Sequence, residues 1–173
     1  MLEDLGLVRA SGAATADFIL AIGPWDWEEN AERYEAMMRE GVARGIPLIC
    51  ANPDLIVRHG GRLVICAGTL AQRYEALGGA VRWHGKPFRS VYETCLGLLG
   101  IANRKRVLAI GDSFRTDIAG ANGAGIGSLF IAGGVHADDF ARGADGMPEL
   151  AGLVAAATEH DARADFVLPR LAW

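Results

Sequence analysis

The fold is decided by residues 106–122, which read RVLAIGDSFRTDIAGAN. A largely apolar run over 106–110 leads directly into Gly111 and Asp112, and a helical pattern follows over about 115–123. A short apolar run that ends at glycine and continues into a helix is typical of a β-α unit in a parallel sheet. In such sheets the carboxyl ends of the strands share one edge, where open α/β folds bind ligands. We therefore expect the Asp112 carboxylate at that edge.

Strands and helices alternate on both sides of this unit. The regular half also has expected strands at 127–131 and 165–168 and expected helices at about 88–99 and 148–158. The first half is less regular, with expected strands at 17–23, 46–51, 63–66 and 81–84 and expected helices at 28–43 and 70–77. This alternation predicts an α/β fold built on a parallel sheet with helices on both faces. We divide it into an α/β region at 1–80 and a second α/β region at 81–173.

Length and composition restrict the class of protein. The chain has 173 residues, of which 51% are hydrophobic and 22% are charged, so it is long enough for one full domain and is expected to build a sizeable core. The net charge of −4 disfavours nucleic acid as a partner and favours a small molecule. The acidic N-terminus does not resemble a signal peptide, and no apolar run approaches membrane-spanning length. We expect a soluble cytoplasmic protein that does not bind membranes.

Two aspartates flank the turn that follows the 106–110 strand. Asp112 lies at the end of the strand, and Asp117 lies in the first turn of the expected helix, which Ser113 or Thr116 can cap. Two carboxylates in one crevice suit Mg²⁺, which normally binds one or two protein carboxylates together with water and a substrate phosphate. The alternative is purely structural, with Asp112 as a turn residue and Asp117 as a helix-capping acid.

Lys86 lies in the sequence Gly85-Lys86-Pro87, after the 81–84 strand and before the next helix. Pro87 is suited to the first position of a helix, so Lys86 is expected at the end of its strand. A single crossover would then bring its ammonium group and the two aspartates to neighbouring strand ends. The ordinary alternative is a solvated surface lysine.

Another expected strand ends in polar residues, at Cys50-Ala-Asn52-Pro-Asp54. If that turn overhangs the same edge, Asn52 and Asp54 are substrate-side groups. Asn-Pro-Asp is also a strong turn former in its own right, and this structural interpretation remains open.

Taken in order, G-K-P at 85–87, G-D-S-F-R-T-D-I-A-G-A at 111–121 and the glycine-rich turn that follows resemble the haloacid-dehalogenase-like (HAD) phosphatase superfamily. The C-A-N-P-D segment resembles the cap of its subclass IIA, the p-nitrophenyl phosphatase and pyridoxal phosphatase-like group. The resemblance implies a HAD-like Rossmannoid core with an α/β cap at about 1–80. It also implies a Mg²⁺-dependent phosphoester hydrolase that acts on a small phosphorylated metabolite.

The same resemblance assigns roles to individual residues. It implies that Lys86 orients the catalytic nucleophile and stabilises the transferred phosphate, and that Asp112 ligates Mg²⁺ with support from Asp117. It places Asn52 and Asp54 near the substrate loop of the cap, and we add Ser113 to the expected substrate-binding residues.

The sequence departs from the family at one decisive point, because the 173 residues contain no D-x-D motif. In the family this motif supplies the nucleophile, and the strand that carries it is central in the sheet. We therefore expect a C-terminal portion of a phosphatase, inactive by itself, with unpaired apolar sheet surface that favours aggregation or pairing with another copy. The alternative is a non-catalytic ligand- or partner-binding protein derived from a HAD phosphatase. A response-regulator-like domain would explain neither G-K-P nor the first half.

Overall fold

The computed structural model describes residues 6–26 and 30–172. The chain forms two compact units. The first comprises the described residues up to Leu55 together with Ile65–Trp83. The second comprises Ile56–Val64 and the described residues from His84 onward.

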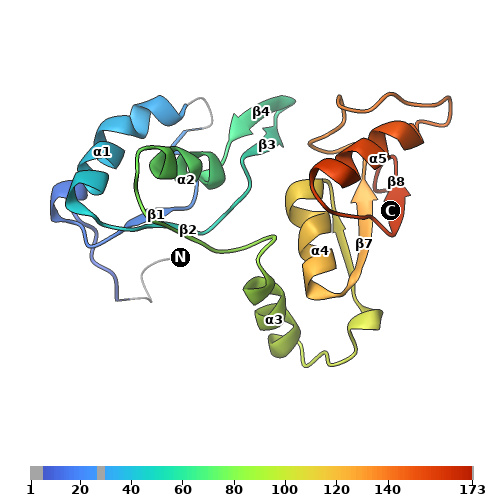
Figure 1. The fold of residues 1–173 in the computed structure, drawn as a ribbon, viewed down its shortest axis with the longest axis horizontal. Helices are drawn as coiled ribbons and strands as arrows, with labels where there is room; N and C mark the ends of the chain where they lie inside the picture. The colour runs from blue at the N-terminus through green and yellow to red at the C-terminus, as the bar shows by residue number, and fades with distance from the viewer. Residues whose placement is uncertain (1–5, 27–29, 173) are drawn as a thin grey trace. The chain divides into compact units, whose positions relative to one another are not determined.

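The first unit is built on a three-stranded parallel sheet with the order β1-β2-β5. Its strands are β1 (Ile19–Ala21), β2 (Leu48–Cys50) and β5 (Val81–Trp83), and its helices are α1 (Glu35–Arg44) and α2 (Ala67–Ala76). Short 3-10 turns cover Ala13–Thr15 and Ala31–Tyr34. Figure 1 shows α2 beside β1 and β2.

The core of the first unit forms between α1, α2 and the sheet. Met38 of α1, Leu48 of β2 and Tyr74 of α2 are fully buried there. The Tyr74 hydroxyl donates a hydrogen bond of 2.6 Å to the carbonyl oxygen of Ile46, so this buried polar group is satisfied. Helix α1 ends at Gly45, whose φ of 68° is the left-handed conformation that glycine adopts most easily.

The second unit is built on another three-stranded parallel sheet, with the order β6-β7-β8. Its strands are β6 (Leu108–Gly111), β7 (Gly127–Ile131) and β8 (Phe166–Leu168), and its helices are α3 (Arg89–Leu98), α4 (Ala119–Ala124) and α5 (Leu150–Glu159). A 3-10 turn at Arg104–Arg106 precedes β6, and a π-helical turn at Phe114–Ile118 precedes α4. The hairpin of β3 (Ile56–His59) and β4 (Arg62–Ile65) turns at two glycines that both have positive φ.

The two faces of the second sheet differ. One face carries a core that includes Phe114 of the π-helical turn and Phe130 of β7, both almost completely buried. The opposite face carries the apolar side chains of β6 and β8, which are between 41% and 62% exposed: Leu108, Ile110, Phe166 and Leu168. Within the described residues, β6 pairs only with β7 and therefore forms an open edge. Parallel sheets are normally covered on both faces, so the apolar surface expected from the sequence is present here.

The predicted α/β fold class with parallel sheets is confirmed. Four details differ from the sequence predictions. The strand β3 was not predicted, the expected helix at 115–123 begins as a π-helical turn, and the described strands form three sheets rather than one. The start of the helix expected at 28–43 lies partly outside the described residues, and its described part comprises a 3-10 turn followed by α1.

The boundary between the units falls after β5, because β5 pairs with β2. Residues 81–83 thus lie in the first unit, whereas the sequence predicts them in the region 81–173. The assignment of one region as cap and the other as core stays a prediction.

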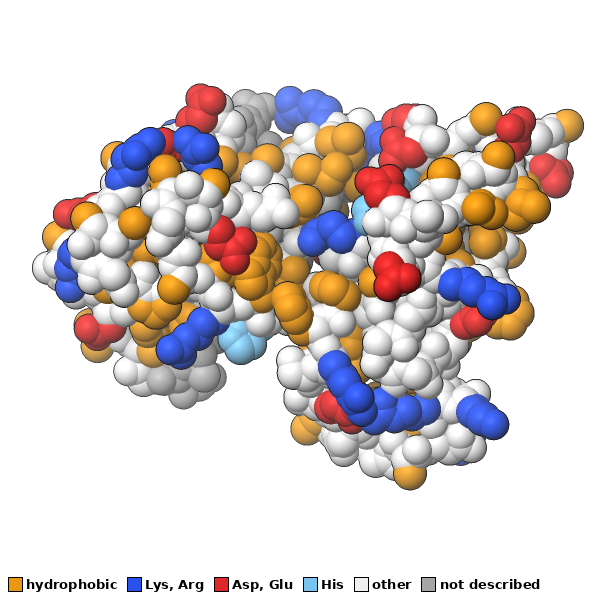
Figure 2. Space-filling model, in the orientation of Figure 1, with side chains coloured by type: hydrophobic (Ala, Val, Ile, Leu, Met, Phe, Trp, Pro, Cys, Tyr) orange, Lys and Arg blue, Asp and Glu red, His pale blue; other side chains and the backbone are white. Residues whose placement is uncertain are grey.

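Helix α3 is tied to the turn that follows it by a cluster of charges. Glu93 accepts hydrogen bonds from Arg104 at 2.7 and 2.8 Å and from Arg89 at 2.8 Å. These guanidinium groups, Arg104 first and then Arg89, lower the pKa of Glu93 to about 2. Figure 2 shows basic and acidic side chains together over this part of the second unit.

Across residues 6–26 and 30–172, every helix is too short or too polar to span a bilayer.

Candidate functional site

Asp117 closes the loop at the end of β6. Its Oδ2 accepts hydrogen bonds from the backbone N–H groups of Asp112 and Ser113, both at 3.1 Å, and the residue is only 9% exposed. Gly111 gives this carboxylate its space, since a Cβ at that position would overlap the Asp117 side chain. The first turn of the helix therefore folds a carboxylate back onto the strand end, as an acid in the first turn of a helix is suited to do.

Lys86 binds the other oxygen of the same carboxylate. Its Nζ donates to Asp117 Oδ1 at 2.6 Å, and the lysine side chain remains 41% exposed. The prediction that Lys86 and the aspartates lie at the ends of neighbouring strands of one sheet was wrong, because β5 and β6 belong to different sheets. The segment between β5 and α3 carries Lys86 to Asp117 instead.

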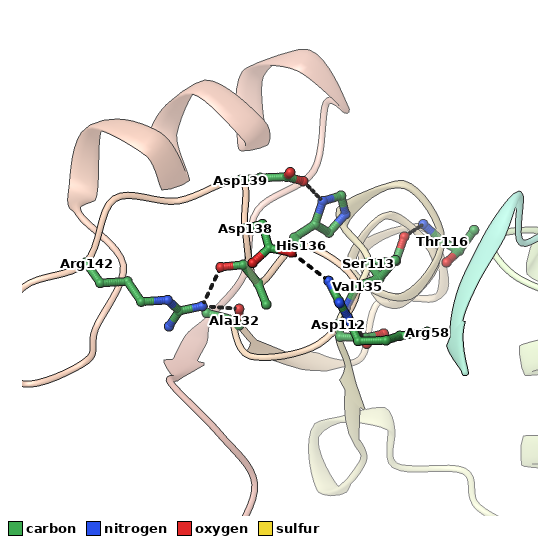
Figure 3. Close-up of polar contacts among 11 residues, drawn as sticks. Arg58, Asp112, Ser113, Thr116, Ala132, Val135, His136, Asp138, Asp139 and Arg142 are labelled. Carbon is green, nitrogen blue, oxygen red and sulfur yellow. Dashed lines mark hydrogen bonds and ion pairs between the residues drawn. The ribbon is translucent and has the colours of Figure 1, made fainter. Parts of the chain in front are cut away.

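Asp112 is held by the loop that follows β7. Its Oδ2 accepts a hydrogen bond of 2.9 Å from the backbone N–H of Val135 (Figure 3). Gly134 lies so close to this carboxylate that a Cβ there would overlap it. Within the described residues, Asp112 Oδ1 accepts no hydrogen bond. Sequence reasoning missed the role of Val135, and the available signal was the Gly133-Gly134 pair shortly after a strand.

The remaining expected site residues lie in local turns. The Ser113 hydroxyl accepts a hydrogen bond of 3.3 Å from the N–H of Thr116 and thereby caps the π-helical turn (Figure 3). Asn52 and Asp54 lie in the first unit, where Asn52 Oδ1 accepts from the N–H of Asp54 at 3.2 Å. This contact is an Asx turn and explains the local sequence without a ligand. Substrate binding by these three residues stays a prediction.

The model of the HAD-hydrolase-like family matches residues 83–172, which is more than half of the chain. The chain belongs to the HAD-like hydrolase family. The resemblance expected from the sequence is thereby confirmed. No curated protein matches the chain.

Solved structures of this family are similar over nearly the whole chain. A haloacid dehalogenase-like hydrolase from Brucella suis 1330 is 36% identical over 96% of this chain, with a TM-score of 0.76. A 4-nitrophenylphosphatase from Thermotoga maritima (22% identity, 97% of this chain, TM-score 0.67) and a p-nitrophenyl phosphatase from Archaeoglobus fulgidus (21%, 92%, 0.62) share the fold. These neighbours are of the kind expected for subclass IIA. The chain spans 60%, 57% and 56% of their respective lengths.

The donor set of this HAD-like site can be compared with the needs of Mg²⁺. The described residues hold no group of three or more His, Cys, Asp or Glu side chains that could bind a metal. At the end of β6, however, the Asp112 Oδ1 oxygen accepts no hydrogen bond from the described residues. Because Mg²⁺ keeps several waters and often uses one or two carboxylates plus a substrate phosphate, this set fits it with Asp112 as the protein ligand. Both Asp117 oxygens have other partners, so its position suits a supporting role.

Proposed function

We propose that these residues form part of the active site of a Mg²⁺-dependent phosphoester hydrolase that acts on a small phosphorylated metabolite. The observation that carries the proposal is the Lys86–Asp117 ion pair beside Asp112, whose Oδ1 accepts no hydrogen bond from the described residues. Family membership and the likeness to phosphatase structures support it. We further propose that the protein is cytoplasmic and binds neither nucleic acid nor membranes; its net charge of −4 argues against a surface for nucleic acid.

Each residue has a defined part in this proposal. Phosphoryl transfer depends mainly on positioning and on electrostatic stabilisation of the phosphoryl oxygens. Asp117 fixes the Lys86 ammonium, and the positive charge of this 41% exposed side chain can attract a phosphate. When bound at Asp112, Mg²⁺ would neutralise charge on the phosphoryl group. Asn52, Asp54 and Ser113 are proposed to contact the rest of the substrate.

The covalent step requires a nucleophile that these residues do not supply. Attack by an aspartate would form an aspartyl-phosphate and release the alcohol, and this chain has no D-x-D motif from which to make it. Lys86, Asp112 and Asp117 can therefore bind and orient a phosphate but cannot displace its leaving group. The same missing motif supports the second candidate function, a non-catalytic ligand-binding protein derived from a HAD phosphatase.

A binding and turnover experiment separates the parts of this proposal. We expect the 173-residue chain to bind inorganic phosphate in the presence of Mg²⁺, measured by calorimetry, and to leave p-nitrophenyl phosphate intact. Lys86→Met should weaken phosphate binding and preserve Mg²⁺ binding, whereas Lys105→Met, which changes the only other lysine, should alter neither. Phosphate binding that survives Lys86→Met would contradict the assignment. Mg²⁺-dependent turnover that Asp112→Ala abolishes would show that these residues already contain a nucleophile.

A further inference from the structure

The loop that follows β7 is held together by one arginine that the proposed chemistry does not use. Arg142 Nη2 donates to the carbonyl oxygens of Ala132 at 2.6 Å and Ala137 at 3.2 Å, and its Nη1 donates to that of Gly146 at 2.9 Å. Figure 3 shows the guanidinium group reaching the end of β7 from the far side of the loop. A single side chain thus links three positions along this loop, at Ala132, Ala137 and Gly146.

The turn enclosed by these contacts is the one that binds Asp112. Val135 lies between Ala132 and Ala137, and its N–H donates to Asp112 Oδ2. Gly134 packs against the same carboxylate without room for a Cβ. Because the hydrogen bond from this turn is the only one that the Asp112 carboxylate accepts from the described residues, a shift of the turn would also move the carboxylate.

Other side-chain contacts of the loop are less suited to hold it. His136 pairs with Asp139 at 2.6 Å, and Arg58 of the β3–β4 hairpin pairs with Asp138 at 2.9 Å. The side chains of these aspartates are 62% and 84% exposed, and exposed pairs contribute little to stability. Arg142 instead binds backbone carbonyls, and its planar fork of donors can serve several of them at once.

We propose that Arg142 is a positioning residue for Asp112: it fixes the 132–137 turn so that the Val135 N–H orients the carboxylate for a cation. The expected effect of Arg142 on Mg²⁺ binding rests on the proposed function. Its expected effect on the hydrogen bond between Val135 and Asp112 does not rest on that function and can be measured without any ligand.

The test uses the full chain with Arg142→Met, Arg142→Lys and the control Arg163→Met. Arg163 lies in the same unit, and only its backbone groups make the contacts that the structure shows. We expect Arg142→Met to accelerate amide hydrogen exchange at Val135 by about tenfold, since it releases contacts from a charged donor. Exchange at Phe130 in β7 should stay unchanged. Lysine should restore part of the protection because it can still donate to one carbonyl.

Coupling to Asp112 gives a readout that a general loss of stability would not produce. In an Asp112→Ala background Val135 has already lost its acceptor, so Arg142→Met should add little further acceleration. The Mg²⁺ dissociation constant, followed from the Val135 amide signal, should rise roughly tenfold in Arg142→Met, as for groups that orient metal ligands. Arg163→Met should change neither quantity.

Unchanged Val135 exchange in Arg142→Met would overturn the proposal, as would equal acceleration at Val135 and Phe130. Full additivity of the Asp112 and Arg142 substitutions would also overturn it. If the unmodified chain binds no Mg²⁺ while Val135 behaves as expected, Arg142 still positions the carboxylate and the proposed metal site fails by itself.

Discussion

Replacement of Asp117 tests how the site is held together. Asp117→Ala removes the acceptor of two backbone N–H groups and the partner of Lys86. A hydrogen bond to a charged group contributes about 1.5–3 kcal/mol, so the two backbone contacts amount to about 3–6 kcal/mol. The ion pair adds little, because the lysine is 41% exposed. We expect the free energy of unfolding of the second unit to fall by about 3–6 kcal/mol.

Asp117→Asn is the matched variant. Both backbone bonds end on the single oxygen Oδ2, so an amide oxygen in that place can accept both, and the expected loss is only about 1 kcal/mol. Hydrogen exchange in urea, followed at amides of β7, reports the second unit separately from the first. Asp138→Ala is the control, since it removes an aspartate that is 84% exposed and also paired with an arginine. An alanine variant within 1 kcal/mol of the parent, or equal losses for alanine and asparagine, would show that the two backbone hydrogen bonds to Asp117 do not stabilise the second unit.

Three further predictions concern space, charge and surface. Gly134→Ala should weaken Mg²⁺ binding at least tenfold in calorimetry, because the added Cβ would overlap the Asp112 carboxylate. The control is Gly123→Ala in α4, whose added Cβ meets open space and should leave Mg²⁺ binding unchanged. The pKa of Glu93 lies at about 2, below its usual 4.5. Its contribution to stability is therefore complete above pH 4.5 and disappears as the pH falls towards 2. A carboxyl titration by NMR that gives a normal pKa for Glu93 would contradict the arginine contacts. Ile110→Lys should reduce self-association in sedimentation velocity, since it charges the uncovered face of the second sheet, and a parent chain that is already monomeric would remove the basis for this expectation.

Local sequence patterns predicted most of the elements. The apolar runs that became β2, β6 and β7 were each too short for a helix and were bounded by Gly or Pro, so they permitted only one assignment. The β3 strand was missed because all four of its residues are exposed, so its sequence lacks the alternation of buried apolar and exposed polar residues that indicates a strand. The π-helical turn was missed because the sequence predicts a helix there without distinguishing a π-helical from an α-helical first turn.

The site was predictable where a motif joined a strand to a helix. Asp112 and Asp117 follow one strand, so their proximity required only local geometry. Lys86 was expected near the two aspartates, but from a sheet order that does not occur, since strand pairing is a long-range property. Its contact with Asp117 was found only in the structure. The Val135 N–H is a backbone group and carries no side-chain signal, and only a glycine pair marks the turn that presents it.

Asp112 is proposed to bind a divalent cation at the end of β6. The most direct measurement is a Mg²⁺ titration of the full chain observed through the backbone amide signals of Asp112 and Val135. We expect saturable shifts confined to the β6 and β7 ends, lost in Asp112→Asn and retained in the exposed control Asp138→Asn. Shifts that persist in Asp112→Asn, or that vanish equally in Asp138→Asn, would contradict the claim.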